Sequence, residues 1–242
     1  MAEDLHELLE RIKWARDEIP AVTAELDAYV ARCFRIGERA NLNPNMATLV
    51  IEISEPVPVS ARARTGTIAN ELRSCLDGLA SSLAVRNGKT ASGVYFPVGE
   101  TEGSFDTDKR LKDKIRKLSA ADRDAVLAFR PFAVGNDGQP GNLLLYGLHH
   151  ADICRKHHRL VATSTTHSMS FVNGYVGILR GFGGSLDQPV NRVAEISNDS
   201  RADLRFQPTF VYAEPDVLRH RSVVETLNEF ANVTETIVTA FT

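Results

Sequence analysis

Hydrophobic residues in the first part of the chain recur at alternating steps of three and four positions. This spacing places them on one side of an α-helix, because residues three and four apart share a face. We call this stripe the seam; it consists of Leu5, Leu8, Ile12, Ala15, Ile19, Val22, Leu26, Tyr29 and Cys33. Pro20 lies beside the seam and predicts a kink in one long helix rather than its end. The seam favours packing within the chain's own bundle, and the alternative is a homodimer in which two seams meet.

The same helical spacing predicts further helices. One covers residues 66–86 and ends at Asn87-Gly88, since glycine commonly terminates a helix. A basic helix covers residues 108–118, and Ser119 with Asp122 forms a capping box that opens the next helix.

Two more helices lie towards the end of the chain. Pro140-Gly141 introduces a histidine-bearing helix that is expected to run to about Val161. Ser222 and Glu225 form a capping box for a final helix, whose apolar residues again step by four and three. The first and last helices carry matching stripes, so we expect them to pack together.

Between these helices the hydrophobic period changes to two, which is typical of strands. Residues 46–60 predict one strand, and Asn173-Gly174 between two alternating segments predicts a type I′ hairpin. Residues 192–197 and 203–214 predict two more strands.

The pattern as a whole predicts an α+β fold, a long-helix bundle with an antiparallel β-sheet inserted before the C-terminal helix. The bundle is expected from residues 1–40, 66–161 and 215–242, and the sheet mainly from 46–60 and 167–213. No glycine-, serine- or proline-rich linker divides the chain, so we expect residues 1–242 to form a single domain.

Composition narrows the class of protein. A net charge of -3 argues against a globally basic nucleic-acid coat. The segment 109–117 holds six cations and one aspartate, which suits either a local binding surface for nucleic acid or a solvated helix face. Three widely spaced cysteines, an acidic start and the lack of a long apolar run predict reduced thiols, no membrane segment and a cytoplasmic location.

The histidine-bearing helix is the first candidate site, because it holds four of the chain's seven histidines. His150, Cys154 and His158 form one row of zinc-type ligands. Three ligands at this spacing diverge along about 12 Å of helix, so a metal would need further ligands from elsewhere. Neither HExxH nor a pair of CxxC motifs supplies them, and no cofactor is expected.

A second hypothesis for this helix is recognition or cleavage of a phosphodiester. His157 and His158 would act as general acid and base, because histidine titrates near neutral pH. The side chains expected to bind the ligand are Arg73, Asp77, Asp152, Arg155 and Arg159. The structural alternative is a bundle helix with a solvated polar face and an Arg73–Asp77 ion pair. The functional hypothesis requires the polar stripe of residues 70–77 to face the histidine helix.

The runs "ELRSCLDGLASSLA", "YFPV", "FRPF" and "LHHADICRKHHRLV" resemble a family of uncharacterised bacterial and phage proteins. That family shows roughly N-L-R-S-A-L-D-H-L-A, then F-P-I, Q-P-Y and D-K-H-R before a strand-rich tail and a closing helix. The matching residues are Leu72, Arg73, Ser74, Leu76, Asp77, Leu79, Ala80, Phe96, Pro97, Pro131, His158 and Arg159. Glu71, Gly78 and Lys156-His157 depart from the pattern. The resemblance implies no activity.

A remoter likeness is to the HEPN superfamily of helical domains, many of which are metal-independent ribonucleases. Their arginine followed by a histidine four to six residues later is missing here, because Arg155 precedes His157 and His158 too closely. The likeness is therefore one of architecture. We expect an RNA- or nucleotide-binding protein, with metal-independent RNA cleavage as its further activity. The alternatives are a non-catalytic scaffold that dimerises through helical seams and a metal-binding protein that uses the histidine helix.

Overall fold

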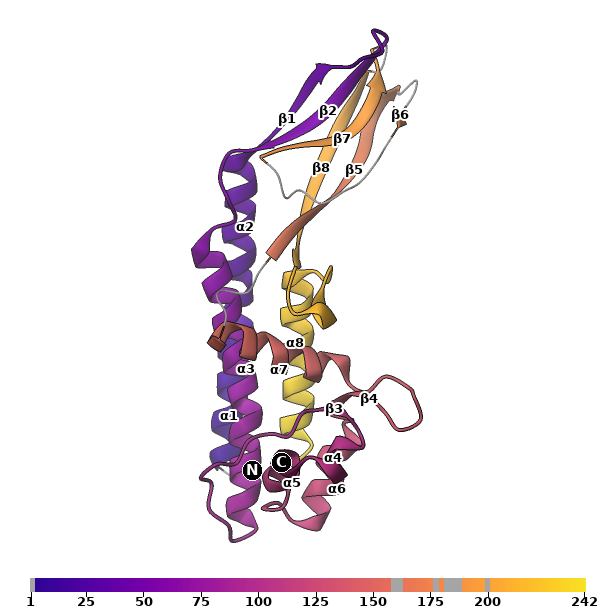
Figure 1. Cartoon of the computed structure of the whole chain (residues 1–242). Helices are drawn as coiled ribbons and strands as arrows, with labels where there is room; N and C mark the ends of the chain where they lie inside the picture. The colour runs from indigo at the N-terminus through magenta and orange to yellow at the C-terminus, as the bar shows by residue number, and fades with distance from the viewer. Residues whose placement is uncertain (1–2, 158–162, 176–178, 181–188, 199–200) are drawn as a thin grey trace.

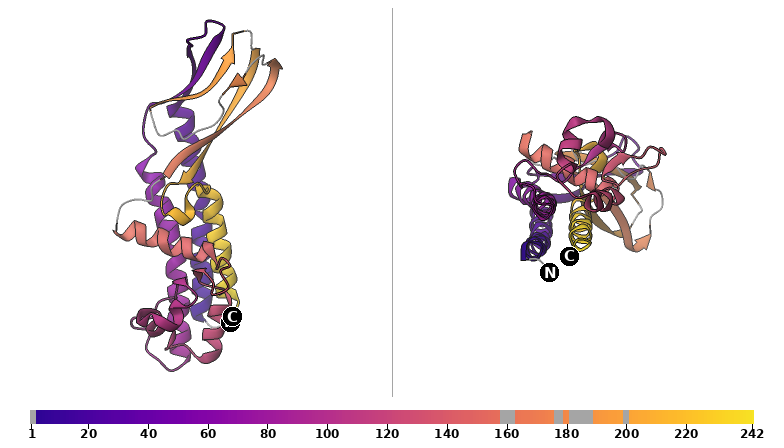
Figure 2. Two further views of the ribbon diagram at one scale, coloured as in Figure 1. Left: turned by 45° about the vertical axis from the view of Figure 1, so that its right-hand side comes forward. Right: turned by 90° about the horizontal axis from the view of Figure 1, so that it is seen from below.

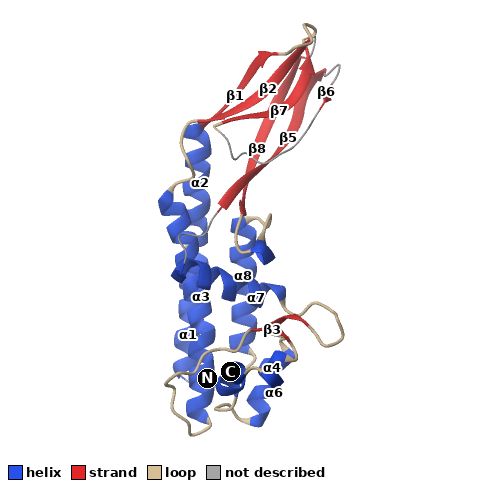
Figure 3. Ribbon diagram, viewed as in Figure 1, coloured by secondary structure: helices blue, strands red, loops and turns tan. Residues whose placement is uncertain are grey.

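The computed structural model describes residues 3–157, 163–175, 179–180, 189–198 and 201–242. It confirms the α+β class: a bundle of long helices carries a β-sheet arm at one end (Figures 1 and 3). α1 begins and α8 ends at the opposite end of the bundle, where Arg86 of α3 pairs with Asp4 and donates to the backbone carbonyl of Phe241 (Figure 2). Among the described residues, no helix has both the length and the apolar character that crossing a membrane requires.

The predicted first helix is present as two collinear parts. α1 (Glu3–Asp17) and α2 (Ile19–Cys33) are separated only by Glu18, and Pro20 occupies the first turn of α2. Proline is tolerated there because the first amides of a helix need no intrahelical acceptor. Every seam residue is at most 5% exposed. The prediction that the seam packs inside the chain is confirmed, since α1 lies against α3 and α8.

Residues 34–40 correct the predicted extent of the bundle. They form strand β1 (Phe34–Ala40) and not the end of the first helix. β1 pairs antiparallel with β2 (Met46–Ile53) over its whole length, from Phe34 opposite Ile53 to Ala40 opposite Ala47. These ladder hydrogen bonds satisfy the backbone of β1, so partner pairing overrides the helical spacing that continues past Cys33.

α3 (Val59–Arg86) begins earlier than the sequence predicts, because Pro58 precedes it in an extended conformation and leads directly into its first turn. The strand predicted over 46–60 therefore ends at Ile53. The predicted C-terminal stop is confirmed: Asn87 caps α3, and Gly88 follows with a φ of 68°. That backbone angle favours glycine.

The hairpin predicted at Asn173-Gly174 is wrong. β5 (Thr163–Tyr175) runs straight through both residues, and it pairs antiparallel with β8 (Arg201–Tyr212) from Thr163 opposite Tyr212 to Tyr175 opposite Arg201. The register shifts between Phe171 and Asn173, so a local irregularity accommodates the turn-forming residues inside a long ladder.

The remaining strands complete the arm. β7 (Val190–Ser197) pairs with β2 on one side and with β6 (Leu179–Arg180) on the other, giving the order β1-β2-β7-β6. Where the arm joins the bundle, the ring of Tyr29 in α2 lies 5.5 Å from that of Phe34 in β1 and 6.0 Å from that of Phe210 in β8, centre to centre.

A smaller layer covers the lower part of α3. It contains the parallel pair β3 (Gly99–Thr101) and β4 (Phe132–Val134), and the helices α4 (Ser104–Thr107), α5 (Lys109–Ile115) and α6 (Ala120–Ala128). The hydroxyl of Ser119 accepts from the backbone amide of Asp122, which confirms the predicted cap of α6.

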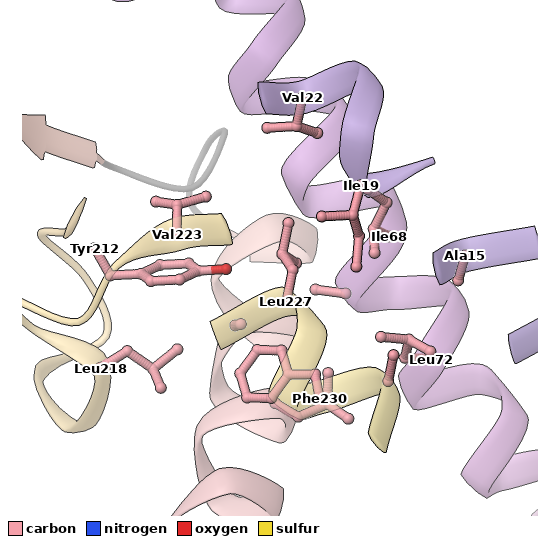
Figure 4. Packing of buried hydrophobic residues seen from close by; sticks show 14 of the residues in the cluster. Ala15, Ile19, Val22, Ile68, Leu72, Tyr212, Leu218, Val223, Leu227 and Phe230 are labelled. Carbon is pink, nitrogen blue, oxygen red and sulfur yellow. The ribbon is translucent and has the colours of Figure 1, made fainter. Parts of the chain in front are cut away.

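α7 (Leu143–His157) crosses the bundle, and the 3-10 helix η1 (Asp216–Leu218) precedes α8 (Val223–Thr239). Ser222 caps α8 as predicted, by accepting from the amide of Glu225. The core lies where α2, α3 and α8 meet, and its apolar side chains interdigitate there (Figure 4). Residues that show this packing are Ile19, Val22, Ile68, Leu72, Leu227 and Phe230.

Candidate functional site

The polar stripe of α3 faces α7, as the functional hypothesis requires. Asn70 donates from Nδ2 to Oδ1 of Asp152 at 2.7 Å, and Asp152 is only 4% exposed. Arg73 donates from Nε to Nδ1 of His149 at 3.4 Å. Among the described residues, the contacts of this stripe with α7 are made by His149 and Asp152, in the middle of that helix.

Arg73 and Asp77 hold the segment before β3 against α3. Oδ1 of Asp77 accepts from Nη1 of Arg73 at 2.5 Å and from the backbone amide of Phe96 at 2.8 Å. Nη2 of Arg73 donates to the carbonyl oxygen of Phe96 at 2.8 Å. We call these three residues the clamp. Because Arg73 is 3% exposed and all its nitrogens donate within the protein, it has a structural role and cannot grip a phosphate directly.

α5 adds a half-buried lysine beside the clamp. Leu111 of α5 packs against Gly99, where an added Cβ would stand 3.0 Å from the leucine side chain. Lys114 lies one turn further along the same face of α5 and is half-buried, and its charge interacts with those of Arg73 and Asp77. Burial lowers the pKa of Lys114 and the neighbouring charge of Arg73 lowers it further, although the carboxylates of Asp77 and Asp108 oppose the shift. Arg110 also lowers it.

The pKa of Asp77, the carboxyl group of the clamp, shifts in the opposite direction to that of Lys114. Burial raises the pKa of Asp77 above its ordinary value, while Arg73, the amide of Phe96 and Lys114 all favour its charged form. Arg73 and Asp77 compensate each other's charge at 2.5 Å, so the positive charge that this group offers to an anion is that of Lys114.

The partly exposed side of α7 carries a second cluster of polar side chains. The rings of Tyr146 and His150, one turn apart, lie 4.3 Å apart between centres, and those of His149 and His150 lie 5.7 Å apart. Burial lowers the pKa of His150 below its ordinary value, and Glu100 of β3 opposes this shift. This shift favours the uncharged form of the His150 imidazole.

Tyr95 and Tyr146 are the members of this surface that sequence reasoning did not single out. Tyr95 immediately precedes the clamped Phe96, and it is 53% exposed. No sequence pattern joins an isolated tyrosine to α5, since its segment is brought there by the clamp and by the bond from Lys117 to the carbonyl of Ser92. We call Tyr95, Lys114, Tyr146, His149 and His150, with the exposed cations of α5, the α5–α7 surface.

The other predicted site residues lie further along α7. Arg155 packs over Gly66 of α3, where an added Cβ would stand 3.1 Å from its Cδ. His157 is the last residue of α7, and its side chain lies outside the described part, as do His158 and Arg159 altogether. The predicted roles of His157, His158 and Arg159 therefore stay predictions.

The predicted row of metal ligands His150, Cys154 and His158 includes a residue outside the described part, so metal binding there stays a prediction. No three histidine, cysteine or acidic side chains that the structure describes stand close enough together to hold an ion. Cys154 is half-buried, and burial raises the pKa of its thiol, which disfavours the thiolate that zinc requires. All three cysteines are free, and burial raises the pKa of Cys75 to about 12.

Comparisons of the chain with known protein-family models, with curated proteins and with solved structures found no match.

Proposed function

We propose that the chain binds RNA or a nucleotide on the α5–α7 surface, through the phosphate groups of the ligand. The observation that supports this most is the basic face of α5, where Lys109, Arg110 and Lys112 are exposed and Lys114 is half-buried. Like charges held close together favour a bound anion, because the anion relieves their repulsion.

The exposed face of α5 extends this positive charge. Lys109, Arg110 and Lys112 are exposed, and none forms an ion pair with any residue that the structure describes. Their acidic neighbours are engaged: Asp108 caps α5 by accepting from the amide of Arg110, and Asp113 pairs with Arg116 at 3.4 Å. A phosphate backbone lying along α5 would meet several cations in succession.

RNA cleavage without a metal is the activity that we propose for the same surface. The half-buried imidazole of His150, whose ring lies against those of Tyr146 and His149, supports it, because histidine is the side chain best suited to proton transfer near neutral pH. His157 and His158, which follow on the same chain segment, are the other proposed acid and base. The free thiols suit a reducing compartment, and the cytoplasm is the location that we propose.

Fluorescence anisotropy with a labelled RNA oligonucleotide and with a labelled nucleotide tests binding. Lys114→Ala should weaken affinity about tenfold at low salt, because one charged contact is lost. Lys13→Ala removes an exposed lysine of α1 whose partner is Asp17, and it should leave affinity unchanged. Equal affinity for both variants, or no binding by the wild-type protein, would refute the proposal.

The same RNA, incubated with chelator and run on a denaturing gel, tests cleavage. His150→Ala and His158→Ala should each reduce cleavage while circular dichroism shows an intact fold. His6→Ala, an exposed histidine of α1, is the matched control. Cleavage that persists in both site variants excludes this mechanism, and it leaves the binding proposal untouched.

A further inference from the structure

We infer that the α5–α7 surface takes a single-stranded nucleic acid, one base of which stacks on Tyr95. This inference rests on the proposed function and specifies the class of its ligand. It depends on the exposure of an aromatic ring, the fixation of the backbone that carries the ring, and the charge beside it.

The ring of Tyr95 is presented to solvent by a segment whose alternate residues point inward. Val94 and Phe96 are 4% and 0% exposed, whereas Tyr95 is 53% exposed. In an extended segment, neighbouring side chains point to opposite sides, so burial of Val94 and Phe96 directs Tyr95 outward.

The backbone on both sides of Tyr95 is fixed. Phe96 is held by both of its backbone polar groups, through Asp77 and Arg73 of the clamp. On the other side, the carbonyl of Ser92 accepts from Nζ of Lys117, which follows α5, and the amide of Val94 donates to the carbonyl of Ala91 at 3.1 Å. A ring on a fixed backbone loses little conformational freedom when a flat ligand stacks on it.

This arrangement gives the clamp a purpose beyond stability. Asp77 accepts from the backbone amide of Phe96, and its charge interacts with that of Lys114. The clamp thereby holds the segment that carries the Tyr95 ring in place beside this cation. Stacking platforms next to cationic tracks are the usual means by which proteins bind single strands without reading their sequence.

An unpaired strand fits this surface better than a duplex. The flat face of a base is available for stacking only when the base is not already stacked within a double helix. A duplex could contact the cations of α5 but not the ring. The inference therefore predicts a preference that depends on Tyr95, in addition to the general attraction of phosphate to α5.

The test compares a single-stranded RNA with a hairpin duplex of the same length, by anisotropy at equal salt concentration. Wild-type protein should bind the single strand more tightly. Tyr95→Ala should lower affinity for the single strand about 5- to 150-fold and leave duplex binding unchanged. Tyr95→Phe should retain the wild-type affinity, because it keeps the ring.

Trp14→Ala is the matched control, since Trp14 is a 47% exposed aromatic residue on α1, and its removal should change neither affinity. Equal affinity for single strand and duplex, or an unchanged affinity of Tyr95→Ala, would overturn the inference. If Lys114→Ala still weakens binding in that case, the proposed function stands without the stacking site. If wild-type protein binds neither RNA, both fail together.

Discussion

At the scale of single residues, two ion pairs with the same helical spacing differ sharply in environment. Arg73–Asp77 in α3 and Lys13–Asp17 in α1 are both four residues apart. The side chains of the first pair are 4% and 24% exposed, and those of the second are 67% and 61% exposed. Sequence spacing alone cannot separate them, because it does not show which faces of the helices are covered.

This contrast gives a prediction for stability. Asp77→Ala should lower the free energy of unfolding by about 3 kcal/mol, because it leaves the guanidinium of Arg73 buried without a counter-charge. Asp17→Ala should have little effect, since water solvates Lys13 when the carboxylate is removed. Urea unfolding followed by circular dichroism measures both. Similar losses for the two variants would show that the clamp does not hold a buried charge.

At the scale of elements, the strongest hydrophobic patterns predicted the structure best. The seam, the helix ends at Asn87-Gly88 and the two serine caps are confirmed, because periodic burial and local hydrogen bonds decide them. β1 was missed because the helical spacing of Cys33, Ile36 and Ala40 continues the seam, whereas pairing with β2 makes this segment a strand. The turn expected at Asn173-Gly174 was wrong for a similar reason, since the long ladder with β8 outweighs a local turn preference.

For the candidate site, the functional hypothesis required the stripe of α3 to face α7, and the structure shows that it does. The sequence could not predict which turn of α7 meets the stripe, because that depends on how the two helices cross. Neither could it predict that the backbone amide of Phe96 binds Asp77, since the alternation of residues 94–98 indicates an extended segment but not its partner.

The buried seam predicts how its mutants behave. Ile12→Ala should lower the free energy of unfolding by about 2–5 kcal/mol, because Ile12 is 1% exposed within the bundle. The loss should be the same at low and high protein concentration, as thermal unfolding at several concentrations will show. A loss that grows on dilution would instead indicate that the seam joins two chains.

At the scale of the whole molecule, the bundle and the arm differ in how they are packed. The bundle buries helices against one another on several sides, whereas the arm extends beyond α2 with β1 at its edge and most of β1 exposed (Figure 1). Hydrogen exchange followed by mass spectrometry should therefore show faster exchange in β1 than in α3 or α8, because edge strands open at lower free energy. Equal protection of β1 and α3 would mean that arm and bundle unfold as one unit.

The chain passes between bundle and arm four times, from α2 to β1, from β2 to α3, from α7 to β5 and from β8 towards α8. A flexible tether would let the sheet swivel, but several parallel connections resist rotation about any one of them. Tyr29, Phe34 and Phe210 stiffen that junction further, because their rings lie in contact across it. A force applied to the loop between β1 and β2, at the distal end of the sheet, is therefore transmitted through these connections to α2 and α8 as a bending force.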